Sequence, residues 1–276
     1  MAFGVVMQTE QLIEPIISIA IDAGKKIQEI YLNGNFEKKT KSDNTPVTSA
    51  DLASHQIIMS SLAMLTPDIP IISEEGASIP LSERSHWARY WLVDPLDGTR
   101  EFISGSDDFS VIIALIEHNR PIVGIVYAPM TETCYYAIAG LGAYKRSSDG
   151  EVRISSHHIN NAEHPALRLA VSRSQDPQSV LSLFNQPHEC ELVLKGGAAL
   201  KTCLVAEGAA DCYIRIGPTG EWDTGAAQII VEEAGGALMD IELQPMSYNE
   251  RETMENPNFI AVGAPSLPWD DILENR

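Results

Sequence analysis

The densest acidic motif of the sequence is the run DPLDGT at 94–99, which follows an apolar stretch. Asp94 and Asp97 flank a proline and precede a glycine, so a turn there can aim both carboxylates at one point and expose the Leu96 carbonyl. Mg²⁺ takes oxygen ligands, and two carboxylates with a carbonyl suit it. The amides of Gly98 and Thr99 can open a helix, and a helix N-terminus binds anions. The motif indicates magnesium chemistry on an anion, with a plain Asp-Gly turn as the alternative.

Three further acidic motifs each have an ordinary structural explanation when taken singly. Asp51 falls in the first turn of a predicted helix, where an acidic residue complements the helix dipole. Glu74 and Glu75 follow an apolar strand, a place where paired acids are often solvated loop charges. Asp223, in the run EWDT before an alanine-rich helix, can serve as an N-cap.

The order of these motifs carries a resemblance to a known family. Glu-Glu after a strand, then DPLDGT, then Trp-Asp at 222–223 resembles the inositol monophosphatase superfamily. Its 3'(2'),5'-bisphosphate nucleotidase branch is the more similar part. The extension Arg100-Glu101-Phe102 separates that branch from inositol phosphatases, which usually read Thr-Asn-Phe there. The resemblance covers residues 10–263, and the other runs that support it are DNTPVT at 43–48, YWLVD at 90–94, CLVAEG at 203–208 and GPT at 217–219.

The resemblance implies a layered αβαβα fold, inhibition by lithium, and a site that holds two or three Mg²⁺ ions. The implied ligands are Glu74, Asp94, the Leu96 carbonyl, Asp97 and Asp223. Asp51 and Thr99 would orient and deprotonate the attacking water, with Glu74 assisting. Positioning and charge neutralisation supply most of the catalysis in phosphoryl transfer, which agrees with these roles.

The implied reaction removes the 3'-phosphate from adenosine 3',5'-bisphosphate (PAP), giving AMP and phosphate, and from its sulfated form PAPS, with a role in sulfur assimilation. The implied substrate contacts are Gly98, Thr99, Ser172, Lys201 and Arg215. Relatives often carry histidine where this chain has Gln175, and Ser-Ser where it has Ala198-Ala199. An inositol-phosphate phosphatase is the alternative enzyme. A catalytically silent metal-binding regulator is the non-enzyme alternative, which a missing ligand or a missing Asp51 would signal.

Composition restricts the partners of the chain. Its 276 residues carry a net charge of −19, which disfavours general nucleic-acid binding. No apolar stretch is long enough for a membrane span, and the N-terminus lacks a signal peptide pattern. We therefore expect a cytoplasmic protein with reduced cysteines. The resemblance implies a small-molecule nucleotide bisphosphate as its substrate. A homodimer and a peripheral position at the cytoplasmic face of the inner membrane are left open.

Hydrophobic periodicity predicts an α+β N-terminal half and an α/β C-terminal half. Helices are expected at 9–32, capped by Thr9, and at 49–65, followed by short strands in antiparallel meanders up to residue 139. After residue 150, strands at 167–171, 191–194, 212–216 and 259–262 alternate with helices at 179–184, 198–207 and 223–234. The polar segment 146–164 is the expected junction. The predicted domains are 1–153, with most metal ligands, and 154–276, with Asp223 and the substrate contacts.

Overall fold

The computed structural model describes residues 9–41, 45–156, 166–173, 176–185 and 190–273. A 3₁₀ turn, η1 (Thr9–Leu12), leads into helix α1 (Ile13–Asn33), and α2 (Ser49–Leu65) packs beside it. Buried side chains at Ile16, Ala20, Ala23 and Ile27 line one stripe of α1. The predicted cap at Thr9 was wrong, because α1 begins only after the 3₁₀ turn and no side chain caps it.

The large sheet has seven strands in chain order, and only its first pair is parallel. Its strands are β3 (Ile71–Ser73), β4 (Arg89–Asp97), β5 (Ser110–Glu117), β6 (Arg120–Ala128), β7 (Thr133–Ile138), β8 (Gly142–Ser147) and β9 (Gly150–Ile154). Short elements flank it, namely β1 (Lys38–Thr40), β2 (Pro46–Thr48), α3 (Leu81–Arg84) and α4 (Thr99–Ser104). The antiparallel meander was therefore predicted correctly from β4 to β7, but the pairing of β3 with β4 is parallel, contrary to the prediction. Strands β8 and β9 occupy part of the segment expected to be a junction.

The small sheet has five strands in the order β11-β10-β12-β14-β13, with β11, β10 and β12 parallel. Its strands are β10 (Arg168–Val171), β11 (Glu191–Leu194), β12 (Cys212–Arg215), β13 (Ala237–Asp240) and β14 (Phe259–Val262). The helical elements of this half are α5 (Gln178–Leu181), α6 (Ala198–Ala206), η2 (Glu221–Asp223), α7 (Gly225–Glu233) and α8 (Trp269–Ile272). The alternation predicted for this half is confirmed.

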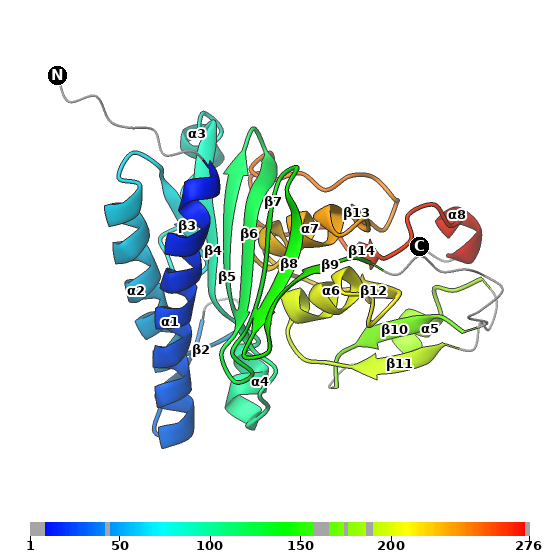
Figure 1. Cartoon of the computed structure of the whole chain (residues 1–276), viewed down its shortest axis with the longest axis horizontal. Helices are drawn as coiled ribbons and strands as arrows, with labels where there is room; N and C mark the ends of the chain where they lie inside the picture. Colours follow the sequence, from blue (N-terminus) through cyan, green and yellow to red (C-terminus); the bar gives the residue numbers. More distant parts are fainter. Residues whose placement is uncertain (1–8, 42–44, 157–165, 174–175, 186–189, 274–276) are drawn as a thin grey trace.

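The elements stack as α, β, α, β, α (Figure 1). Helices α1 and α2 cover one face of the large sheet, α6 and α7 lie between the sheets, and α5 and α8 lie beyond the small sheet. Helix α7 approaches the large sheet closely at Gly124 of β6, where a Cβ atom would lie 2.4 Å from the Ala226 carbonyl oxygen. The layered fold is thus confirmed, and the division after residue 153 stays a prediction.

Within the described part of the chain, no helix is both long and apolar enough to cross a membrane. All four cysteines are free thiols, and three of them are buried.

Candidate active site and metal centre

A β-bulge brings Asp94 and Asp97 to the same side of the sheet. Side chains three residues apart in a regular strand point to opposite faces. Here Asp94 pairs with Ile112 and Asp97 with Ser110, so three steps along β4 match two steps along β5. The extra residue is the bulge that re-aims the second carboxylate. The Asp94 carboxylate also accepts the Leu96 amide at 2.9 Å, which fixes the turn.

Asp223 approaches these two carboxylates from the other half of the chain. Carboxylate oxygens of Asp94, Asp97 and Asp223 lie within 4.8 Å of one another, as a shared cation would require. Asp223 ends the 3₁₀ turn η2 and is not the N-cap of α7; its carboxylate accepts the Gly220 amide at 2.5 Å. The alternative of a simple cap is therefore wrong for this residue.

The electrostatics of this cluster suit a divalent cation. Burial raises the pKa of Asp94 well above its ordinary value, and the charges of Glu74 and Asp223 raise it further. Burial likewise raises the pKa of Asp223, with Asp97 as the strongest charged neighbour. Buried like charges at this spacing are costly unless a cation compensates them. An all-oxygen donor set of this kind fits Mg²⁺.

Glu74 lies at the edge of the cluster, directly after β3. It is within hydrogen-bonding reach of Asp94. The Lys41 ammonium contacts Glu74 at 2.7 Å and Glu75 at 2.5 Å, a pairing that sequence reasoning missed. Burial raises the pKa of Glu75 to about 7. Lys41 therefore supplies positive charge to the acids that flank the cluster.

Asp51 and Thr99 form a hydrogen-bonded pair beside the cluster. Thr99 Oγ1 donates to Asp51 Oδ1 at 2.9 Å. The other oxygen, Asp51 Oδ2, accepts the Thr48 amide at 2.8 Å and the Thr48 hydroxyl at 2.5 Å, so a capping box at the start of α2 holds the carboxylate. Burial raises the pKa of Asp51, and the bonds from Thr48 oppose that shift. The helix-start interpretation of Asp51 is therefore confirmed, and its catalytic role stays a prediction.

The peptide at Leu96 is held from two sides. Ser54 of α2 donates its hydroxyl to the Pro95 carbonyl at 2.8 Å, and Thr99 Oγ1 lies 3.2 Å from the Leu96 carbonyl. Gly98 adopts φ +93°, and a Cβ atom there would lie 2.9 Å from the Asp108 carbonyl oxygen. Glycine is therefore required where the chain leaves β4 and starts α4.

The start of α6 touches Asp97 through backbone amides. Asp97 Oδ1 accepts the Ala198 amide at 3.1 Å, and Oδ2 accepts the Ala199 amide at 3.0 Å. The Ala199 side chain is fully buried in the core, so a serine hydroxyl there would not face a ligand. The alanine at 199 therefore removes no hydrogen-bond donor from the cavity, whereas Ala198 does line it. Gln175 lies outside the described residues.

Two cationic side chains, Lys201 and Arg215, line a cavity that the carboxylates of the acidic cluster also line. Lys201 is buried, and its ammonium donates to Ser172 Oγ at 3.1 Å and to the Gly197 carbonyl at 2.7 Å. Burial lowers the pKa of Lys201 to about 8. Arg215 donates to the Pro218 carbonyl at 3.1 Å, and its Nε is buried without a partner in the described structure.

A single cavity of about 580 Å³ unites these features. All residues predicted as metal ligands or substrate contacts line it, and Asp51 reaches it through Thr99. The sequence reasoning missed one wall, formed by Trp222 and by Thr253, Met254 and Glu255. No local motif marks 253–255, because that wall is set by contacts with distant segments.

The chain belongs to the inositol monophosphatase family, whose sequence model matches residues 8–265. It is similar to the protein named 3'(2'),5'-bisphosphate nucleotidase CysQ of Haemophilus influenzae, with 41% identity over 96% of this chain and 97% of that protein. The protein of the same name from Aggregatibacter actinomycetemcomitans is 43% identical over 97% of this chain and 98% of its own length.

Solved structures agree with the family assignment. The crystal structure of CysQ from Bacteroides thetaiotaomicron, described as a bacterial member of the inositol monophosphatase family, superposes with a TM-score of 0.77. It is 32% identical, and the match covers 94% of this chain and 99% of that one. The extragenic suppressor protein SuhB from Bartonella henselae superposes with a TM-score of 0.75 at 26% identity, covering 92% and 94% of the two chains.

Proposed function

We propose that this chain is a Mg²⁺-dependent 3'(2'),5'-bisphosphate nucleotidase. It would remove the 3'-phosphate of adenosine 3',5'-bisphosphate to give AMP and phosphate, and would act in the same way on the sulfated nucleotide PAPS. Similarity to nucleotidases at 41% and 43% identity over nearly the full length supports this proposal. So does the acidic cluster, whose buried carboxylates suit a divalent cation.

One observation supports a bisphosphate, and not a monophosphate, as the substrate. The same cavity is lined by the carboxylates of Asp94, Asp97 and Asp223 and by the cations of Lys201 and Arg215. A monoester needs partners for one phosphate only. A second phosphate, kept away from the carboxylates, needs positive charge of its own, which lysine and arginine supply.

The first role in hydrolysis is to bind the metal ions. Asp94, Asp97, Asp223, Glu74 and the Leu96 carbonyl would hold two or three Mg²⁺ ions. When bound, the metal would supply Lewis acidity and neutralise charge on the transferring phosphoryl group.

The attacking water would be handled by the hydrogen-bonded pair beside this cluster. Thr99 already donates its proton to Asp51, so its oxygen is free to accept a hydrogen bond from water. Asp51 would then take up the proton that the water loses. Gly98 and Thr99 line the cavity and would contact the scissile phosphate, while Ser172, Lys201 and Arg215 would contact the rest of the nucleotide.

The test is a phosphate-release panel in the presence of Mg²⁺. Adenosine 3',5'-bisphosphate, its sulfated form and inositol 1-phosphate are compared at matched concentrations. We expect kcat/KM to be highest for the two nucleotides, and release to stop when EDTA is added. Preference for inositol 1-phosphate would replace the proposal with the alternative enzyme. No release from any substrate would favour a silent metal-binding regulator.

The homodimer and the place of the protein in the cell stay predictions. We propose a cytoplasmic enzyme of sulfur metabolism, in agreement with the small nucleotide substrate.

A further inference from the structure

Arg84 is a buried arginine that makes no contact with the cavity yet joins the two halves of the chain. It ends α3, between Glu74 and strand β4, and its side chain is 1% exposed. One guanidinium nitrogen donates to Asn249 Oδ1 at 2.6 Å, and the Asn249 side-chain amide donates back to the Arg84 carbonyl at 2.7 Å. The other terminal guanidinium nitrogen of Arg84 donates to the carbonyls of Arg251 and Glu252, at 2.6 and 2.9 Å.

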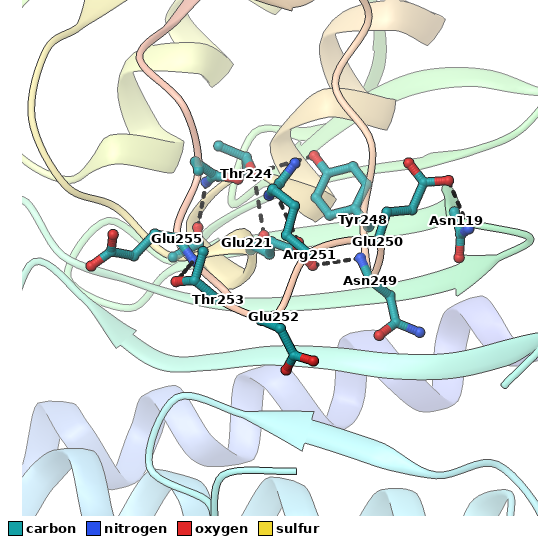
Figure 2. A network of polar contacts seen from close by, with 12 residues as sticks. Asn119, Glu221, Thr224, Tyr248, Asn249, Glu250, Arg251, Glu252, Thr253 and Glu255 are labelled. Atoms are coloured by element: carbon teal, nitrogen blue, oxygen red, sulfur yellow. Dashed lines mark hydrogen bonds and ion pairs between the residues drawn. The ribbon is translucent and has the colours of Figure 1, made fainter. Parts of the chain in front are cut away.

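The segment that Arg84 holds is bonded in turn to Glu221, two residues before Asp223. Figure 2 shows segment 248–255 lying against Glu221 and Thr224. The fully buried Glu221 carboxylate accepts the Asn249 amide at 2.9 Å and the Arg251 guanidinium at 2.9 Å. Buried carboxylates are expensive unless hydrogen-bonded in this way, so the contacts fix the position of Glu221.

The same segment holds the turn that carries Asp223. The Glu221 amide donates to the Met254 carbonyl at 2.8 Å. The Asn256 side-chain amide donates to the Gly220 carbonyl at 2.5 Å. Gly220 then donates its own amide to the Asp223 carboxylate. The two sets are joined at Thr224, whose hydroxyl donates to the Glu221 carbonyl at 3.2 Å and accepts the Asn256 side-chain amide at 3.1 Å. A continuous series of hydrogen bonds therefore runs from Arg84 through Asn249, Glu221, Thr224, Asn256 and Gly220 to Asp223.

Asp223 is the one predicted carboxylate ligand that comes from the C-terminal half, whereas Asp94, Asp97 and Glu74 come from the N-terminal half. The distance between Asp223 and the three ligands of the N-terminal half depends on how the halves are joined near the cavity. Metal affinity is sensitive to this, because Mg²⁺ demands near-ideal geometry at short oxygen distances. Residues that orient the ligands of a metal therefore affect affinity without touching it.

We infer that Arg84 is a positioning residue for the metal centre, and that by clamping segment 249–252 it sets Asp223 opposite Asp94 and Asp97. The inference rests on the proposed metal-dependent function and deepens it. The clamp also fixes Thr253, Met254 and Glu255, which form one wall of the cavity.

The test measures metal binding directly on the full-length protein. Mn²⁺ is titrated into wild type and Arg84→Met, and free Mn²⁺ is followed by electron paramagnetic resonance. Loss of an outer-shell partner typically weakens metal affinity by about 10–100-fold. Because Arg84 acts on Asp223 through several hydrogen bonds, we expect the lower end of this range: a rise of about tenfold in the Mn²⁺ Kd, and a similar rise in the Mg²⁺ concentration for half-maximal activity.

Arg168→Met is the matched control. Arg168 also joins several partners, pairing with Asp211 at 2.6 Å and donating to the Gly208 carbonyl at 2.9 Å, but it does not line the cavity. This variant should lose thermal stability while its Mn²⁺ Kd stays within about twofold of wild type, as expected for sites without shared partners.

Arg251→Met provides a milder break in the same series, since that side chain is about one-third exposed. It should fold and show a smaller rise in the Mn²⁺ Kd, which Arg251→Lys should partly reverse. If the Arg84 and Arg251 variants bind Mn²⁺ as wild type does, or no more weakly than Arg168→Met, the inference is overturned while the proposed function stands. Failure of wild type itself to bind Mn²⁺ would instead overturn both.

Discussion

Replacing Asp94 by asparagine should impair metal binding and activity while stabilising the metal-free fold. The substitution removes one negative charge from a cluster whose oxygens lie within 4.8 Å of one another. The asparagine carbonyl oxygen can still accept the Leu96 amide, so the turn is kept. At an effective dielectric constant near 20, two unit charges at this distance repel by about 3.5 kcal/mol. Because the raised pKa of Asp94 leaves part of that charge neutralised by a proton, we expect metal-free Asp94→Asn to be more stable than wild type by about 1–3 kcal/mol.

The pH dependence of this gain follows from the direction of the pKa shift. A carboxyl whose pKa is raised by folding keeps its proton longer in the native state, so it destabilises the fold increasingly as pH rises above the ordinary value of 3.8. The cost is complete only above the raised pKa of the native state. The stability difference between Asp94→Asn and wild type should therefore be small near pH 4 and grow as pH rises toward the raised pKa of Asp94.

Thermal unfolding with and without Mg²⁺ is the assay. For a chain of this size about 2–4 °C of Tm corresponds to 1 kcal/mol, so the metal-free variant should unfold roughly 2–12 °C higher. A saturating cation at a hundred times its Kd stabilises by about 2.7 kcal/mol, and the variant should lose most of that gain. Its turnover should fall at least about a hundredfold, the equivalent of 2.7 kcal/mol. Normal turnover, or a metal-free variant less stable than wild type with an unchanged response to Mg²⁺, would refute the site assignment.

Three further predictions use the same structure. Asp51→Asn should lower kcat by roughly 10²–10⁴-fold while the Mn²⁺ Kd changes less than about twofold, because Asp51 contacts Thr99 and not the acidic cluster; a parallel loss of Mn²⁺ binding would contradict this. Lys201→Ala should reduce kcat/KM for the bisphosphate roughly ten- to a hundredfold and spare a simple monophosphate. Equal losses of the variant on both substrates would mean that Lys201 serves the fold instead. In wild type the KM for the bisphosphate should also rise above about pH 8, where the buried Lys201 ammonium loses its proton. Lithium at millimolar-order concentration should inhibit where equal sodium does not, since a monovalent ion in a Mg²⁺ position supplies less charge; equal effects would indicate ionic strength alone.

Much of the secondary structure follows from local patterns in the sequence. Helix α2 and strands β11 and β14 begin and end where hydrophobic periodicity and turn residues place them. Strands β8 and β9 were missed because their exposed faces are polar, as at 150–153, and resemble a linker. They form strands because successive hairpins extend the sheet from β7. This pairing depends on the tertiary structure and not on the local sequence.

The acidic motifs could also be found in the sequence, because each combines carboxylates with turn residues in a short run. Their residue types, carboxylates beside turn residues, already indicated magnesium chemistry on an anion. What the motifs could not establish is that their side chains meet. Asp223 lies more than a hundred residues from Asp97, and only the packing of α7 on the large sheet brings them within 4.8 Å.

Tertiary structure alone decided the rest of the site. The bulge between Asp94 and Asp97 is visible only against the register of β5, and the Lys41 pair depends on the approach of a distant hairpin. Arg84, which the sequence presents as an ordinary surface cation, is buried by partners 165 to 168 positions away. Residue type and local spacing determine which groups are available for chemistry. Which of them share a cavity is determined by long-range packing, because a buried charge is stable only where distant segments supply its hydrogen bonds.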